Sequence, residues 1–158
     1  MKELKNSEKT SETLGFMVSA CIEQLKDEKD VIANLSNISS FINFYMDRCN
    51  WVGFYLFKEN ELVLGPFQGL PACIRIPLGK GVCGTAALEK RTLRIENVHE
   101  FPGHIACDAA SNSEIVIPII KNGEIYGVLD IDSPELSRFT ELEEEYLTKI
   151  VKEIEKYI

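Results

Sequence analysis

The sequence has little of what several classes of protein require. Its 158 residues include 17 Lys and Arg against 25 Asp and Glu, a net charge of −8. The basic surface that nucleic-acid binders use is therefore missing, and we expect no nucleic-acid partner. No apolar run approaches the ~18 residues that span a bilayer, and Met1–Glu8 lacks the apolar core of a signal peptide. We therefore expect a cytoplasmic protein with no membrane partner.

The five cysteines include no Cys-x-x-Cys pair. In a reducing compartment they do not indicate a structural disulfide framework, and metal binding or thiol chemistry is the better interpretation. Cys73, Cys83, Cys107 and His104 offer the ligand types of a tetrahedral zinc site, but only His104 and Cys107 are close in sequence. We favour a thiol relay without metal, in which one thiolate becomes a sulfenic acid and a second thiol condenses with it.

Apolar periodicity predicts a single domain over residues 1–158. The spacing favours helices at Ser11–Lys26, Val31–Cys49 and Glu141–Ile158, a short helix from Gly79 to about Lys90, and strands at Asn50–Phe57, Leu62–Leu64, Ala72–Pro77, Arg91–Ile95, Glu114–Ile120 and Glu124–Asp132. Cys21 and Cys49 lie on the first two helices and are interpreted as small core residues. The order of elements predicts an α+β fold, with an antiparallel sheet flanked by N- and C-terminal helices.

The stretch Phe101–Val116 is the most informative in the chain. It begins as a long loop with a Pro-Gly pair, His104 and Cys107, and from Glu114 it becomes an apolar strand. Loops of this length inside compact domains are usually functional or disordered, and this one is too rich in apolar residues to be a solvated linker. We therefore interpret it as the lip of an active site, with Cys107 as its reactive atom.

The glycine-rich segment Gly79–Gly84 invites comparison with phosphate-binding loops. Its spacing matches neither a dinucleotide fingerprint nor a P-loop, so we do not predict nucleotide binding. The segment places Cys83 in the first turn of a helix, where the backbone dipole favours a thiolate.

Two acids interrupt the apolar strand before Ser133. Asp130 and Asp132 are two residues apart and share a face, and acids are depleted in strands. Glu114 opens the partner strand, and the hairpin turn decides which way it points. A two-residue Asn-Gly turn would place Glu114 opposite Ile131 and away from the aspartates, whereas a three-residue turn ending in Gly123 would place it opposite Asp130. Three carboxylates together would repel, so at least one should hold a proton near neutral pH.

The strand Asn50–Phe57 carries aromatic residues on one face. Trp51 and Tyr55 share that face with Gly53, and they suit either the core or a pocket wall. Gly53 between them indicates a point where another group approaches the sheet closely.

Several of these segments together resemble the free methionine-(R)-sulfoxide reductases, enzymes built on the GAF fold. The resemblance is carried by the segments at 50–55, 65–69, 81–84, 101–108, 113–116 and 127–133. It spans about residues 50–139 and includes all three cysteines of the family. It implies a GAF-like sheet flanked by helices, with no metal or organic cofactor.

The resemblance also implies roles for individual residues. Cys107 corresponds to the nucleophile, Cys83 to the main resolving thiol and Cys73 to a second resolving thiol. The matched substrate-binding residues are the aromatic pair and the three acids: Trp51, Tyr55, Glu114, Asp130 and Asp132.

The implied reaction is reduction of free L-methionine-(R)-sulfoxide to methionine. The catalytic cysteine would become a sulfenic acid, then form an intramolecular disulfide that thioredoxin reduces. The alternative is a non-catalytic GAF module that binds a small ligand or senses redox state. The sequence leaves the oligomeric state open, a homodimer being one alternative.

Overall fold

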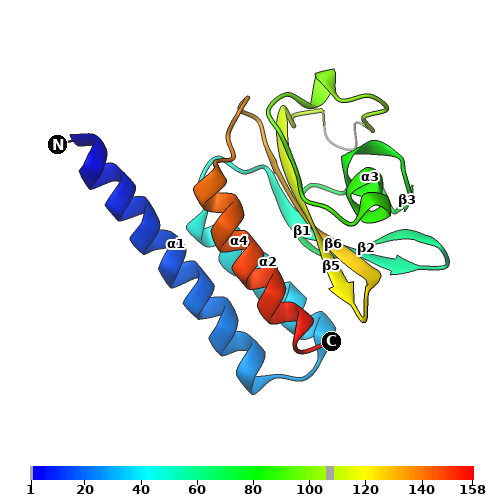
Figure 1. The fold of residues 1–158 in the computed structure, drawn as a ribbon, viewed down its shortest axis with the longest axis horizontal. Helices are drawn as coiled ribbons and strands as arrows, with labels where there is room; N and C mark the ends of the chain where they lie inside the picture. The colour runs from blue at the N-terminus through cyan, green and yellow to red at the C-terminus, as the bar shows by residue number, and fades with distance from the viewer. Residues whose placement is uncertain (1, 106–108) are drawn as a thin grey trace.

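A six-stranded antiparallel sheet, in the order β3-β2-β1-β6-β5-β4, forms the centre of the molecule (Figure 1). The computed structural model describes residues 2–105 and 109–158. The elements are α1 (Lys2–Asp27), α2 (Val31–Tyr45), β1 (Trp51–Lys58), β2 (Glu61–Gly69), β3 (Arg75–Pro77), α3 (Gly81–Glu89), β4 (Leu93–Ile95), the 3₁₀ turn η1 (Val98–Glu100), β5 (Ser113–Lys121), β6 (Glu124–Ser133) and α4 (Glu141–Glu155). The predicted α+β class and antiparallel sheet are confirmed.

Three helices, α1, α2 and α4, lie together on one face of the sheet (Figure 1). Their apolar faces pack on the inward side chains of β1, β5 and β6 to form the larger core. Cys21 is fully buried in this core and Cys49 packs against it, as the sequence predicted for both. In the described part of the chain, no helix is long and apolar enough to cross a membrane.

The opposite face of the sheet carries α3 and the long connections on either side of it (Figure 1). A second, smaller core lies here, and it includes Trp51, Tyr55 and Cys83. These three residues, all predicted to belong to the site, therefore lie on the face that the three-helix layer does not cover.

The β5–β6 hairpin differs from the turn that an acid cluster was expected to need. Lys121 pairs with Glu124, so the turn has two residues, Asn122 and Gly123, with φ of +52° and +78° as a type I′ turn requires. Farther along, Ile119 pairs with Gly127 while Ile120 pairs with Ile125. Tyr126 is therefore an extra residue in β6, a bulge that shifts every later pair by one.

The bulge decides where Glu114 points. It sets Glu114 opposite Asp132, rather than opposite Ile131 or Asp130 as the two turn lengths alone would predict. Residues opposite each other in an antiparallel pair share a face, so Glu114 and both aspartates lie on one side of the sheet. The cluster does not need the three-residue turn that was expected for it: the turn has two residues, and the bulge places Glu114 on the face of Asp130 and Asp132.

Gly123→Ala should destabilise the protein by about 1 kcal/mol, because an L side chain at φ of +78° is strained. No heavy atom of the described residues lies within 4 Å of an added Cβ, so the cost is conformational and not a clash. Gly15→Ala is the matched control, since it also has free space but lies inside α1 and should stabilise by up to about 1 kcal/mol. Urea unfolding measures both, and equal effects would contradict the strained turn.

Candidate active site

The three predicted carboxylates meet on the α3 face of the sheet. Asp132 lies between Trp51 on β1 and Glu114 on β5, and Asp130 lies one pleat further along, opposite Gly53. Glu114 is 6% and Asp130 5% exposed, although neither has a cationic side chain among its described hydrogen-bond partners. Acids are almost never this deeply buried unless they are paired, so the cluster is a strong indication of a site.

Burial controls the protonation of these acids. It raises the pKa of Glu114 well above its ordinary range, and the nearby charges of Asp130 and Asp132 raise it further. Burial also raises the pKa of Asp130. Because the groups interact, the proton belongs to the cluster as a whole. The expectation that at least one of the three carboxyl groups is protonated near neutral pH therefore agrees with the structure.

Cys83 lies in the first turn of α3, as predicted, but its thiol is not activated there. Its side chain is 5% exposed. Burial raises the pKa of the thiol well above its ordinary value, and the charges of Asp130 and Glu114 add to the effect. The thiol donates a hydrogen bond to Glu114 Oε1 at 3.7 Å. The helix dipole acts on Cys83, but burial beside carboxylates outweighs it, so the expected thiolate is not favoured.

Trp51 and Tyr55 form an aromatic wall beside the acids. Their rings stack with centroids 5.8 Å apart, and both side chains are 2% exposed. The Trp51 indole N–H donates to the Leu70 carbonyl at 3.2 Å, and the Tyr55 hydroxyl donates to the Cys73 carbonyl at 2.9 Å. These bonds fix both rings and tie the wall to the connection that carries Cys73.

The close approach predicted at Gly53 is real, but its cause is internal. A Cβ at this position would lie 2.3 Å from Phe67 Cβ and 2.8 Å from the Trp51 ring. Gly53 therefore makes room for neighbouring side chains of the sheet. The wall formed by Trp51 depends on this glycine, because any larger residue would displace the indole.

The three cysteines predicted to form the relay differ in what the structure shows of them. Cys73 is disulfide-bonded, whereas Cys83, like Cys21 and Cys49, is a free thiol. Cys107, the predicted nucleophile, lies outside the described residues. Cys73 and Cys83 belong to the core on the α3 face, and Cys21 and Cys49 belong to the other, so the sequence separated the two groups correctly.

These side chains line one pocket together with residues that the sequence did not single out. Among the described residues the lining is Trp51, Tyr55, Ala72, Ile76, Lys80, Gly81, Val82, Cys83, His104, Ile105, Ser111, Glu114, Asp130 and Asp132. His104, Ile105 and Ser111 bring the described part of the long loop to this pocket, which agrees with its interpretation as a lip. Burial and the neighbouring His99 lower the pKa of His104, which favours a neutral imidazole. The sequence could have pointed to Lys80 because this residue lies between Gly79 and Gly81. Both glycines have a positive φ in the structure.

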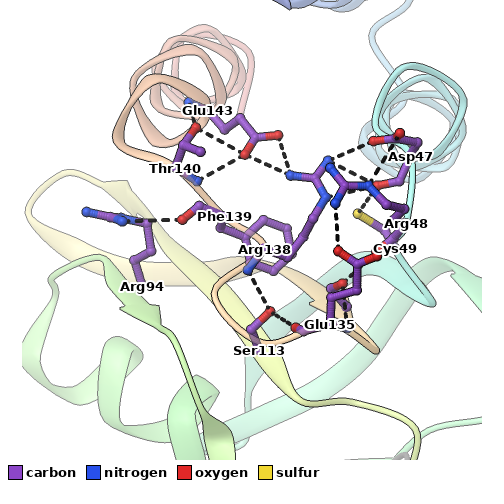
Figure 2. Close-up of polar contacts among 11 residues, drawn as sticks. Asp47, Arg48, Cys49, Arg94, Ser113, Glu135, Arg138, Phe139, Thr140 and Glu143 are labelled. Carbon is purple, nitrogen blue, oxygen red and sulfur yellow. Dashed lines mark hydrogen bonds and ion pairs between the residues drawn. The ribbon is translucent and has the colours of Figure 1, made fainter.

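A buried ion-pair network supports the ends of the strands that carry the acids (Figure 2). The Arg138 guanidinium binds the Glu143 carboxylate at 2.7 and 2.8 Å and the Asp47 carbonyl at 3.0 Å. The Arg138 backbone N–H donates to the Ser113 hydroxyl at 3.3 Å, and that hydroxyl donates to the Glu135 carbonyl. Since Ser113 directly precedes Glu114, the network fixes the start of β5.

Comparisons with known proteins agree with this architecture. A family model described as "GAF domain" matches residues 37–158. The chain is 52% identical over 131 residues to a curated Escherichia coli protein named "Free methionine-R-sulfoxide reductase", covering 83% of this chain and 79% of that protein.

Solved structures give the same result. The reduced form of fRMsr of Staphylococcus aureus has a TM-score of 0.88 and 54% identity, covering 91% of this chain and 94% of that one. A free methionine-R-sulfoxide reductase from Neisseria meningitidis, solved in complex with its substrate, has a TM-score of 0.87 and 42% identity, covering 89% and 85%. The fold is therefore shared with proteins of over 40% identity.

Proposed function

Since this chain belongs to the free methionine-R-sulfoxide reductases, a family of GAF-domain oxidoreductases, we propose that it reduces free L-methionine-(R)-sulfoxide to L-methionine in the pocket on the α3 face. The observation that carries the proposal is the burial of Glu114, Asp130 and the Cys83 thiol beside the Trp51–Tyr55 wall. A ligand-binding or redox-sensing module needs no such concentration of acids and thiols. The enzymatic alternative is therefore preferred.

The acids suit a substrate that carries a free ammonium group. Asp130 Oδ1 is buried and has no hydrogen-bond partner among the residues that the structure describes. An ammonium would donate to it in a charge-assisted bond, which is stronger than a neutral one. Trp51 and Tyr55 would pack on the S-methyl end. The substrate carboxylate would meet Lys80, which lines the same pocket.

The same cluster can supply the proton that the reaction needs. The Cys107 thiolate would attack the sulfoxide sulfur while a protonated carboxyl gives its proton to the sulfoxide oxygen. The S–O bond breaks, the oxygen passes to the cysteine as a sulfenic acid, and methionine leaves. Glu114 is the best donor, because burial and its neighbours raise its pKa and so favour its protonated form.

We assign the role of resolving thiol to Cys73 rather than Cys83, the reverse of the order that the sequence suggested. Cys73 is disulfide-bonded. Cys83 is not in a disulfide, and its buried thiol donates a hydrogen bond to Glu114. In the proposed relay, Cys73 condenses with the sulfenic acid and releases water. Thioredoxin, acting in the cytoplasm, would then reduce the disulfide. Cys83 stays protonated and orients the carboxyl of Glu114.

Glu114→Gln should lower kcat/KM for the free sulfoxide by about 10²-fold or more, because the amide keeps the shape but cannot donate the proton. Glu124→Gln is the matched control, since Glu124 lies exposed on the same hairpin and should have no effect. Methionine release is measured with dithiothreitol as reductant on both sulfoxide epimers. Full activity of Glu114→Gln, or equal reduction of the (S) epimer, would contradict the proposal.

A further inference from the structure

We propose that Cys83, Glu114 and Asp130 form a binding site for a thiophilic divalent cation such as Zn²⁺, and that the bound cation closes the pocket to substrate. The cation would act as an inhibitor and not as a cofactor. Three features carry the inference: the spacing of the ligand atoms, an acceptor left without a partner, and the chemical type of the three ligands.

The spacing is close to that of a tetrahedral metal. One ligand atom from each of the three residues lies within 4.8 Å of the others, and Cys83 Sγ is 3.7 Å from Glu114 Oε1. Ligands on tetrahedral Zn²⁺, with bonds of about 2.3 Å to sulfur and 2.1 Å to oxygen, stand about 3.6 Å apart. The Cys83–Glu114 pair already has this separation, and an Asp130 oxygen lies within 4.8 Å of both ligand atoms.

The unpartnered acceptor points to a cationic ligand independently of that spacing. Asp130 is deeply buried, with only 5% of its surface exposed. Its Oδ1 accepts no hydrogen bond from the described residues and belongs to a side chain that lines the pocket. A buried carboxylate oxygen without a donor is costly, and either an ammonium or a metal ion would satisfy it.

The ligand set selects the kind of metal. A thiolate beside two carboxylates suits Zn²⁺ or Cd²⁺, whereas Mg²⁺ and Ca²⁺ prefer oxygen ligands alone. When deprotonated, the three groups carry three negative charges, which a divalent cation neutralises in large part. Three protein ligands leave a fourth position for water on the pocket side.

The proposed cation site and the proposed substrate site use the same atoms, so the cation should affect activity. Asp130 Oδ1 and the Glu114 carboxyl are the groups that we assign to the substrate ammonium and to proton donation. A cation bound to both residues would occupy Asp130 Oδ1 and displace the proton of the Glu114 carboxyl. Cation and substrate should therefore exclude each other, and this part of the inference rests on the proposed function.

The test is a titration with Cd²⁺, whose bond to a thiolate gives an ultraviolet charge-transfer band. The protein is used oxidised, so that Cys73 remains in its disulfide and cannot supply a thiolate. We expect one equivalent to bind with the band, the band to be lost in Cys83→Ala, and the affinity to fall at least tenfold in Asp130→Asn. Cys49→Ala is the control that removes a free thiol elsewhere and should keep the band.

A band that survives in Cys83→Ala, or that disappears in Cys49→Ala, would overturn the site. Unchanged affinity in Asp130→Asn, an isosteric variant that should fold, would overturn it as well. A separate arm adds free methionine sulfoxide, which should weaken Cd²⁺ binding at least fivefold. If the band behaves as expected but substrate has no effect, the metal site stands and the substrate assignment fails.

Discussion

Cys107→Ser should abolish methionine release, with or without thioredoxin. An alcohol is too poor a nucleophile to attack the sulfoxide sulfur without a strong base beside it. The loss should exceed about 10³-fold in kcat, measured by quantifying methionine after mixing enzyme with free methionine-(R)-sulfoxide.

The other thiols provide the controls. Cys73→Ser should release one methionine per enzyme and then stall with thioredoxin, because the sulfenic acid has lost its proposed resolving partner. Cys83→Ser should keep thioredoxin-driven turnover at a reduced rate, and Cys49→Ser should behave as wild type, since Cys49 packs against the opposite core. Stalling of Cys83→Ser together with full turnover of Cys73→Ser would reverse the relay to the order that the sequence suggested.

Arg138→Met should destabilise the protein by about 3–5 kcal/mol, the largest stability effect that we expect from a single change. Its side chain is 5% and that of Glu143 7% exposed, so removing the guanidinium leaves a buried carboxylate without its cation. The Asp47 carbonyl loses its donor as well. Urea unfolding followed by far-ultraviolet circular dichroism measures the change.

Two further variants separate ion pairing from the loss of a long side chain. Adding Glu143→Leu to Arg138→Met should recover part of the stability, although the capping bond of Glu143 to the Thr140 N–H is lost. Arg91→Met removes an exposed pair with Glu89 and should change stability by less than about 1 kcal/mol. An effect of Arg138→Met as small as that of Arg91→Met would contradict the role of the buried network.

Local patterns predicted the type and order of the helices and strands, because their signals lie within a few residues, although α1 begins at Lys2 rather than Ser11 and β2 ends at Gly69 rather than Leu64. Asp30 caps α2 by accepting from the Ala33 N–H at 2.8 Å, and Thr140 and Glu143 form a capping box at the start of α4. The end of α2 was predicted four residues late. The carbonyls of Asp47 and Arg48 there bind the distant side chains of Arg138 and Ser133, which no local pattern reveals.

The chemistry of the site was predictable from residue types, but its geometry was not. Asp130 and Asp132 were identified because acids are rare on an apolar strand. The position of Glu114 depends on the bulge at Tyr126, and a bulge between ordinary strand residues leaves no clear mark in the sequence. The pKa of Cys83 was misjudged because the helix dipole is visible in the sequence, whereas burial against Glu114 and Asp130 appears only in the fold.

The central claim is that the buried acids recognise a free amino acid. The most direct test compares kcat/KM for free methionine-(R)-sulfoxide, its N-acetyl form and a methionine-sulfoxide peptide. Losing the ammonium leaves Asp130 buried without its cation, at a cost of about 3 kcal/mol, so the N-acetyl form should react more than 100-fold more slowly. The peptide should show no turnover. Comparable kcat/KM for all three would mean that the acids serve the sulfoxide oxygen alone, and would contradict a free amino-acid substrate.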